Sequence, residues 1–209
     1  MDRKGILLVV SGFSGAGKGT LMKELVSRYD NYALSISATT RSPREGEVDG
    51  REYFFRTKEE FEQMIADEAL IEYACYVGNY YGTPRAYVEE QLALGRDVIL
   101  EIEIQGALQI KKRFPDTLLL FVSTPDAETL KNRLIGRGTE SLDVVEKRLS
   151  RASEEAEGIE NYDYFIINDD LDTCVTQVHQ IIQGEHSRVS RNLELINTIK
   201  KDISKFQKG

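Results

Sequence analysis

The nine residues Gly12–Thr20, GFSGAGKGT, constrain the fold of this chain more than any other stretch. They match the phosphate-binding pattern G-x-x-x-x-G-K, in which glycines let backbone N–H groups face an anion and the lysine reaches a nucleotide's β and γ phosphates. An apolar run precedes them and a helical pattern follows, as such a site requires, because the helix N-terminus adds positive potential. The sequence therefore predicts a nucleotide site formed by Gly12, Phe13, Ser14, Gly15, Ala16, Gly17, Lys18, Gly19 and Thr20.

One position departs from the usual form of this loop. The lysine is normally followed by Ser or Thr, whose hydroxyl ligates Mg²⁺. Here Gly19 takes that place, and Thr20 follows one residue late. The departure affects only the expected metal arrangement, because backbone N–H groups and Lys18 remain to bind phosphate.

The rest of the chain alternates between predicted strands and helices. Short apolar runs predict buried strands at Ile6–Gly12, Arg96–Gly106, Thr117–Ser123 and Tyr162–Asp169. Apolar residues at helical spacing predict helices at about Gln105–Arg113, Ala127–Ile135, Val144–Ala156 and Asp172–Gln183. This order is typical of an α/β fold, in which a parallel sheet is flanked by helices and ligands lie at the carboxyl ends of the strands.

Two segments interrupt that alternation. Ser35–Gly95 is rich in polar and aromatic residues and is predicted to form an inserted lobe, whereas Asp126–Gly158 is densely charged and nearly all helical. We therefore divide the chain into a core (1–34, 96–125 and 159–186), a lobe (35–95), a charged helical segment (126–158) and a C-terminal helix (187–209).

That C-terminal segment, Ser187–Gly209, is predicted to be an amphipathic basic helix. Its apolar residues recur at steps of three and four, and it carries six basic residues against two acidic ones. We expect its apolar stripe to pack on the chain's own core. The alternative is a contact between subunits, which would make the protein a homo-oligomer.

Charge and composition exclude some classes of partner. A net charge of −8 argues against a general nucleic-acid binder, so any bound polyanion must meet a local basic site. No stretch approaches the ~20 apolar residues of a membrane span, and Cys75 and Cys174 form neither a CxxC motif nor a disulfide framework. We expect a cytoplasmic protein without nucleic-acid or membrane partners.

The predicted lobe holds the residues for a second anion site. Arg41, Arg44 and Arg51 lie among hydroxyl groups and glycines, and Tyr80 and Tyr81 follow further along. Each arginine alone is typical of a solvated surface. Together they favour a phosphate, because guanidinium groups bind phosphate through two parallel hydrogen bonds and tyrosine hydroxyls can donate to it.

Several stretches together match one known family. SGFSGAGKGT, ATTRSPREGEVDGREYFF, IEYACYVGNYYGTPR, LEIEIQG and LIGRGTES closely resemble guanylate kinase, in order from about Ile6 to Ile182. The resemblance implies a single domain over about residues 5–184, with a P-loop NTPase core. It also implies that segment 35–95 is a GMP-binding lobe and segment 126–158 a mobile helical lid.

The resemblance implies a role for individual residues on the GMP side. Glu72 would accept hydrogen bonds from the N1–H and N2 amino groups of guanine, which suits a carboxylate because guanine offers two adjacent donors where adenine has an acceptor at N1. The whole implied GMP set is Ser37, Arg41, Arg44, Tyr53, Glu72, Tyr81, Thr83 and Glu101, of which Arg41, Arg44, Tyr53 and Tyr81 would hold the phosphate.

On the ATP side the resemblance implies roles for basic residues of the lid. Arg133 would contact the ATP phosphates, and Asn168 and Asp169 the adenine. The implied catalytic set, which neutralises charge on the transferred phosphoryl group, is Lys18, Arg44, Arg137 and Arg148.

The implied reaction is Mg²⁺-dependent transfer of the ATP γ-phosphoryl group to GMP, and to dGMP, giving ADP and GDP. Because Gly19 lacks a hydroxyl, we expect Mg²⁺ to be held mainly by the ATP phosphates and water, with Thr20, Glu101 and Glu103 nearby. Two alternatives stay open: another nucleoside monophosphate kinase such as adenylate kinase, and a non-catalytic kinase-like module that binds phosphopeptides.

Overall fold

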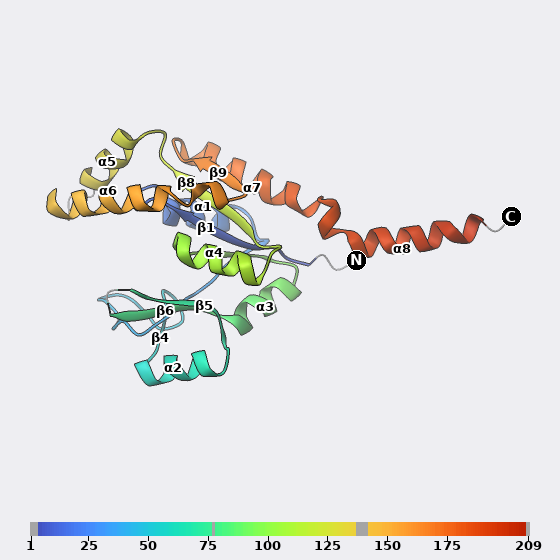
Figure 1. The fold of residues 1–209 in the computed structure, drawn as a ribbon, viewed down its shortest axis with the longest axis horizontal. Coiled ribbons are helices and arrows are strands. Elements are labelled where there is room, and N and C mark those ends of the chain that lie inside the picture. Colours follow the sequence, from blue (N-terminus) through green and yellow to red (C-terminus); the bar gives the residue numbers. More distant parts are fainter. Residues whose placement is uncertain (1–3, 77, 137–141, 208–209) are drawn as a thin grey trace.

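The computed structural model of this chain describes residues 4–76, 78–136 and 142–207. At its centre lies a sheet of five parallel strands in the order β2-β7-β1-β8-β9 (Figure 1). The prediction of a parallel α/β core is confirmed. The strands are β1 (Leu7–Gly12), β2 (Tyr32–Leu34), β7 (Asp97–Glu101), β8 (Leu118–Ser123) and β9 (Tyr164–Ile167), of which β2 was not predicted.

Helices cover both faces of this sheet, which explains why its strands read as continuous apolar runs. Leu8 and Val10 of β1 point to the face covered by α1 (Lys18–Arg28) and α7 (Leu171–His186). Val9 points to the opposite face, which packs against α3 (Arg85–Ala93) and α4 (Ile104–Arg113). A polar side chain at any of these strand positions would be buried.

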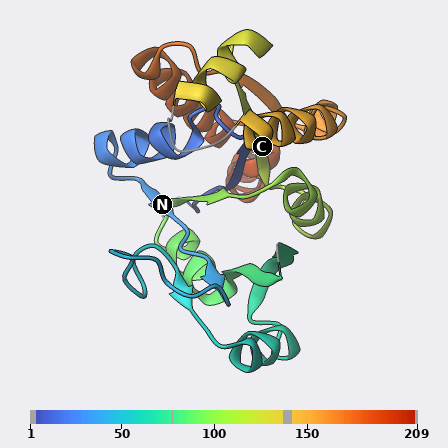
Figure 2. The same cartoon turned by 90° about the vertical axis from the view of Figure 1, so that its left-hand side faces the viewer.

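A second, smaller sheet forms within residues 35–95. Its strands, in the order β4-β3-β6-β5, are β3 (Ala38–Thr39), β4 (Phe54–Phe55), β5 (Leu70–Tyr76) and β6 (Asn79–Pro84). Helix α2 (Lys58–Ala66) closes a separate small core through the buried Phe61. Figures 1 and 2 show this sheet and α2 to one side of the central sheet, with α4 between the two sheets.

Two helices lie beside the phosphate loop. They are α5 (Ala127–Gly136) and α6 (Leu142–Ala156), and a 3₁₀ turn, η1 (Ile159–Asn161), leads on to β9. Leu130 and Leu134 of α5 form a small cluster with Ala152 of α6, against which Phe13 of the loop packs. The helical segment therefore contacts the core through the phosphate loop itself.

The C-terminal segment differs from its prediction in two ways. It is not one helix from Ser187: a 3₁₀ turn, η2 (Val189–Arg191), precedes α8 (Leu193–Ile203), and η3 (Ser204–Gln207) follows. The expectation that it packs on the chain's own core is wrong, because α8 extends away from the rest of the molecule (Figure 1) and Ile203 and Phe206 are 56% and 88% exposed. The turn η2 is held to the body by a hydrogen bond from Arg191 to the Asp116 carbonyl, and this sets the direction of α8. The spacing of apolar residues does not encode such a contact.

Two smaller expectations can be compared with the described residues. None of the described helices is long and apolar enough to span a bilayer. Both cysteines are free thiols, Cys75 exposed and Cys174 buried. Burial raises the pKa of the Cys174 thiol to about 11, which makes it unreactive at neutral pH.

Candidate active site

The phosphate loop joins β1 to α1 at the carboxyl edge of the central sheet. Gly17 caps α1 in a left-handed conformation (φ 88°), and a Cβ there would lie 2.6 Å from Asn168 Nδ2. That Nδ2 donates to the Ala16 carbonyl at 2.8 Å, and Asn168 is buried. Asn168, which the resemblance assigns to the adenine of ATP, thus holds the loop backbone from its place just after β9.

Lys18 folds back over this loop. Its Nζ donates to the carbonyls of Gly12 at 2.6 Å and Phe13 at 3.1 Å, which holds the ammonium group against the start of the loop. The carboxylate of Glu101, at the end of β7, faces the same point. Burial raises the pKa of Glu101, while the positive charges of Lys18 and Lys23 oppose that shift.

A cleft of about 560 Å³ brings the loop, the carboxylates and the helical segment together. Lys18 and Glu101 face Arg148 of α6 across it, and Arg137 lies outside the described residues. Thr20 is exposed on α1 and is not among the lining residues. The lining comprises Gly12, Ser14, Lys18, Glu101, Ile102, Glu103, Ile104, Lys147, Arg148, Arg151 and Glu155.

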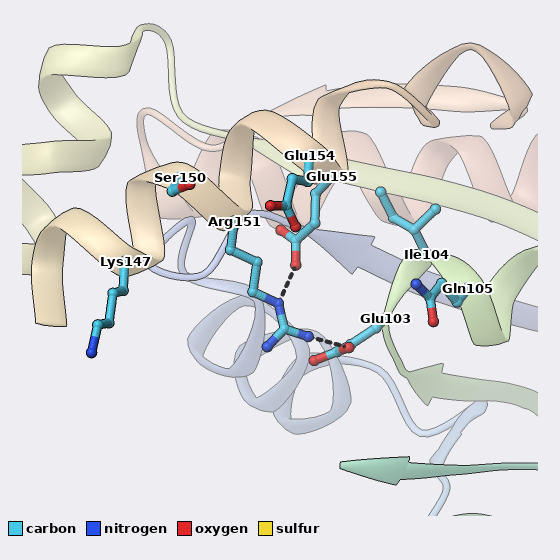
Figure 3. A pocket seen from close by; sticks show the side chains of 8 residues that line it. All are labelled: Glu103, Ile104, Gln105, Lys147, Ser150, Arg151, Glu154 and Glu155. Atoms are coloured by element: carbon cyan, nitrogen blue, oxygen red, sulfur yellow. Dashed lines mark hydrogen bonds and ion pairs between the residues drawn. The ribbon is translucent and has the colours of Figure 1, made fainter. Parts of the chain in front are cut away.

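An ion-paired arginine links the helical segment to the core beside this cleft. Arg151 of α6 donates from Nη2 to Glu103 Oε2 at 2.6 Å, and its Nε lies 3.4 Å from Glu155 Oε1. Figure 3 shows this triad on the wall of an adjoining pocket of about 470 Å³. The sequence placed Glu103 near the site but gave no sign that it pairs with Arg151, because 48 residues separate them.

In the lobe, an unpredicted carboxylate organises the basic residues. Arg41 donates from both terminal nitrogens to Glu47 at 2.9 Å, and the backbone N–H of Arg44 donates to the same carboxylate at 2.7 Å. Arg41 also lies over the Tyr53 ring, which packs edge-on against Tyr81 at 6.0 Å. The Arg41 guanidinium lowers the pKa of Glu47. Three members of the predicted phosphate set are thus brought together, while the Arg44 side chain is exposed.

Glu72 is the one acidic side chain of the predicted GMP set that is buried in the lobe. It lies on β5, is 7% exposed, and accepts a 2.8 Å hydrogen bond from the Thr83 hydroxyl on the neighbouring β6. Burial raises the pKa of Glu72, and the bonds from Thr83 partly oppose that shift. Gly106 of α4 faces the other oxygen, where a Cβ would lie 3.4 Å away. The lobe thus holds a desolvated carboxylate in one orientation.

We expect Glu72→Gln to raise the melting temperature of the nucleotide-free protein near neutral pH, and to lose this gain in acid. Because burial raises the folded-state pKa of Glu72, the wild-type chain loses stability as pH rises from the unfolded pKa, about 4.3, through the folded one. Below that window both states hold the proton. Calorimetry at about pH 7 and about pH 4 should show a higher melting temperature for the variant at the higher pH only. The expected shift is roughly 2–4 °C for each kcal/mol added to the free energy of unfolding. An equal difference at both values would contradict this account of the carboxylate.

The polar residues of the lobe and those around the phosphate loop do not share one cavity among the described residues. No described lobe residue lines the 560 Å³ cleft. Burial raises the pKa of Tyr53, and the charges of Tyr81, Glu47 and, least of these, Glu101 add to that shift while Arg41 opposes it. The remaining predicted residues are dispersed: Ser37 precedes β3, Arg133 is half-buried on α5, and Asp169 is exposed before α7.

The carboxylates of the cleft do not form a complete metal site on their own. Among the described residues, no group of three or more His, Cys, Asp or Glu side chains is placed to hold a metal ion. Glu101 and Glu103 nevertheless offer oxygen ligands, which Mg²⁺ prefers when phosphates and water supply the rest of its coordination.

Comparison with known proteins identifies the family. The sequence model of the family described as guanylate kinase matches residues 4–185. The guanylate kinase of Bacillus anthracis is 53% identical over 191 residues, 91% of this chain and 93% of that protein. The guanylate kinase of Streptococcus agalactiae serotype III is 48% identical over 206 residues, 98% and 99% of the two chains.

A solved structure agrees with the sequence relatives. The crystal structure of guanylate kinase from Anaplasma phagocytophilum superposes with a TM-score of 0.72 at 29% identity and covers 90% of this chain and 89% of that one. Neither adenylate kinase nor a non-catalytic binding module gains support from these relatives. The chain belongs to the guanylate kinase family.

Proposed function

We propose that this protein transfers the γ-phosphoryl group of ATP to GMP, and also to dGMP, giving ADP and GDP. The buried Glu72–Thr83 pair carries the proposal, because a desolvated carboxylate in a fixed orientation suits the two adjacent donors of guanine. Adenine presents an acceptor at N1 and would leave this carboxylate unpaired, which costs about 1–3 kcal/mol or more. The family relationship supports the same reaction.

On the ATP side, we assign the phosphates to the loop and the lid. The N–H groups of Gly12–Thr20 would surround the β phosphate, and the ammonium group of Lys18 would reach the β and γ phosphates. Arg133, Arg137 and Arg148 would approach from the helical segment 126–158, which we propose acts as a lid. Asn168 would contribute by holding the loop, and Asp169 would lie nearest the adenine.

On the GMP side, Arg41, Arg44, Tyr53 and Tyr81 would bind the phosphate. The guanidinium group of Arg41 pairs with Glu47 through both terminal nitrogens. This pairing keeps the guanidinium beside Tyr53 and Tyr81, so the donors are already oriented when an anion arrives. Ser37, Glu72 and Thr83 would contact the base, and Glu101 would lie between the two substrates.

The chemistry needs no general base. The second pKa of a phosphate monoester is about 6, so the attacking GMP oxygen is already largely ionised at neutral pH. Catalysis then depends on alignment of the two substrates, exclusion of water by lid closure, and neutralisation of the charge on the transferred group. Lys18, Arg44, Arg137 and Arg148 supply that positive charge. Mg²⁺, for which Glu101 and Glu103 offer oxygen ligands, would supply further charge neutralisation at the ATP phosphates.

We expect Gly19→Ser to change kcat by less than about tenfold at saturating Mg²⁺, because the ATP phosphates and water supply most ligands of the ion. The change is sterically tolerated, since a Cβ at Gly19 would lie 3.8 Å from Glu101 Oε2. Gly19→Ala is the matched control, as it adds the same Cβ without the hydroxyl. If Gly19→Ser gained tenfold or more over Gly19→Ala, the missing hydroxyl would limit the natural enzyme.

A coupled assay of ADP release tests the proposed substrate. With ATP and Mg²⁺ present, GMP and dGMP are expected to be turned over, and AMP and UMP to react at least about 10²-fold more slowly in kcat/KM. Turnover of AMP or UMP equal to that of GMP would overturn the assignment of Glu72. No ADP release with any monophosphate would instead indicate a binding module.

A further inference from the structure

Helix α6 carries three charged residues on the face that it turns to the cleft. Arg148, Arg151 and Glu155 are spaced by three and four residues, which places them within about 60° of one another around the helix. All three line the 560 Å³ cleft, as does Lys18 of the phosphate loop. The position of α6 therefore decides how far the Arg148 guanidinium group lies from Lys18.

Arg151 joins this charged face to the core. Its Nη2 donates to Glu103 Oε2 at 2.6 Å, and Glu103 stands at the N-terminus of α4, just after the end of β7. Its Nε lies 3.4 Å from Glu155 Oε1, so the guanidinium group lies between two carboxylates (Figure 3). Burial raises the pKa of Glu155, and the charges of Arg151 and Lys18 oppose that shift. The ion pairs therefore lie within electrostatic reach of the phosphate loop.

The apolar contacts of α6 lie on another side of the helix. Leu149 and Ala152 pack with Leu130 and Leu134 of α5 and with Phe13. This cluster is small, and α5 belongs to the same charged segment as α6. A helix that is held along one side can still rotate about that side, whereas an additional contact on the charged face removes this freedom.

We propose that Arg151 is a positioning residue for the phosphoryl transfer: by holding α6 to Glu103, it keeps Arg148 at the distance from Lys18 that the transferred group requires. Arg151 lies one helical turn from Arg148, so a displacement of one moves the other by a similar amount. Alignment has a steep effect, because a misplacement of about 1 Å can cost on the order of 10²-fold in rate. The inference rests on the proposed function, which assigns Arg148 to the transferred group.

Hydrogen exchange of the full chain without added nucleotide tests the attachment itself. Arg151→Gln and Glu103→Ala each remove the pair, and both are expected to speed amide exchange in α6 by about two- to fivefold, the factor that a partly exposed ion pair contributes. Exchange in β1 and β8 should not change. Glu103 lies outside α6 and makes no capping hydrogen bond to α4, so its loss alters the helix propensity of neither. Exchange of α6 at the wild-type rate in Glu103→Ala would overturn the proposal.

Single-turnover kinetics with saturating ATP, GMP and Mg²⁺ test the consequence for the reaction. Arg151→Gln is expected to lower the rate by about three- to fivefold and to leave the dissociation constant of GMP within about twofold. Arg28→Gln is the matched control, because Arg28 also pairs with a carboxylate of its own helix, Glu24, and one of another helix, Asp172. Its side chain is 33% exposed, against 35% for Arg151. An unchanged rate in Arg151→Gln, or equal losses in the two variants, would overturn the proposal.

A double-mutant cycle shows whether Arg151 acts through Glu103. If it does, adding Arg151→Gln to the Glu103→Ala chain should lower the rate by less than about 1.5-fold further. Any contribution of Glu103 to Mg²⁺ binding is common to both members of that comparison. Losses that multiply would mean that Arg151 contacts the phosphates itself, and would overturn a positioning role. The exchange experiment uses no substrate, so its failure is distinct from a failure of the proposed kinase reaction.

Discussion

Lys18→Met is expected to lower kcat for GMP phosphorylation by about 10³-fold, the largest single effect that the account predicts. The Lys18 ammonium lies over the loop, 2.6 Å from the Gly12 carbonyl, where the β and γ phosphates would sit. Methionine keeps the length of the side chain and removes the charge that stabilises the transferred group. Single-turnover measurement with saturating ATP and GMP separates this loss from weakened binding.

Lys23→Met is the matched control for that experiment. Lys23 lies one turn further along α1 and is exposed, and its charge also reaches Glu101. Loss of this lysine removes the same charge from the same helix without removing a phosphate donor, so kcat should fall by no more than a few fold. Similar losses in both variants would mean that general positive potential, rather than the position of Lys18, supports catalysis.

Glu72→Gln is expected to lower kcat/KM for GMP by about 10²-fold and to reduce the preference for GMP over IMP. IMP lacks the 2-amino group of guanine, so wild type should use it poorly because one carboxylate oxygen stays unpaired. A glutamine has only one acceptor oxygen, so it should change the discrimination between GMP and IMP by about 1–3 kcal/mol, or roughly 5- to 150-fold.

The ratio of kcat/KM for GMP to that for IMP checks this, because it cancels general losses in folding or in phosphate binding. Glu90→Gln, an exposed change on α3, serves as the control and should leave the ratio unaltered. A Glu72→Gln enzyme that keeps the wild-type ratio would show that Glu72 does not read the base.

The core and its phosphate loop could be predicted because their signals are local. Ile6–Gly12 reads as a buried strand since both faces of β1 are covered, and the glycines of the loop occupy backbone conformations that favour glycine. Strand β2 was missed because Tyr32–Leu34 has only three residues, too few for a periodic pattern. Its place beside β7 is fixed by pairing with residues more than sixty positions away.

The particular pairings between polar groups could not be predicted, whether the two residues are close or distant in the sequence. Glu47 stands within a motif that was noted, yet nothing local indicates that it, rather than a ligand, accepts the fork of Arg41. Asn168 follows a recognised strand, but its bond to the Ala16 carbonyl spans 152 residues. The direction of α8 likewise depends on Arg191 donating to the Asp116 carbonyl, a contact that amphipathic spacing does not encode.

Transfer of a phosphoryl group from ATP to GMP can be followed by ³¹P NMR of the reaction mixture. With ATP, GMP and Mg²⁺, we expect the GMP signal to be replaced by GDP while ADP forms in equal amount. The same mixture with AMP in place of GMP should stay unchanged over that time. ADP with inorganic phosphate but no GDP, or conversion of AMP at the rate of GMP, would contradict the account.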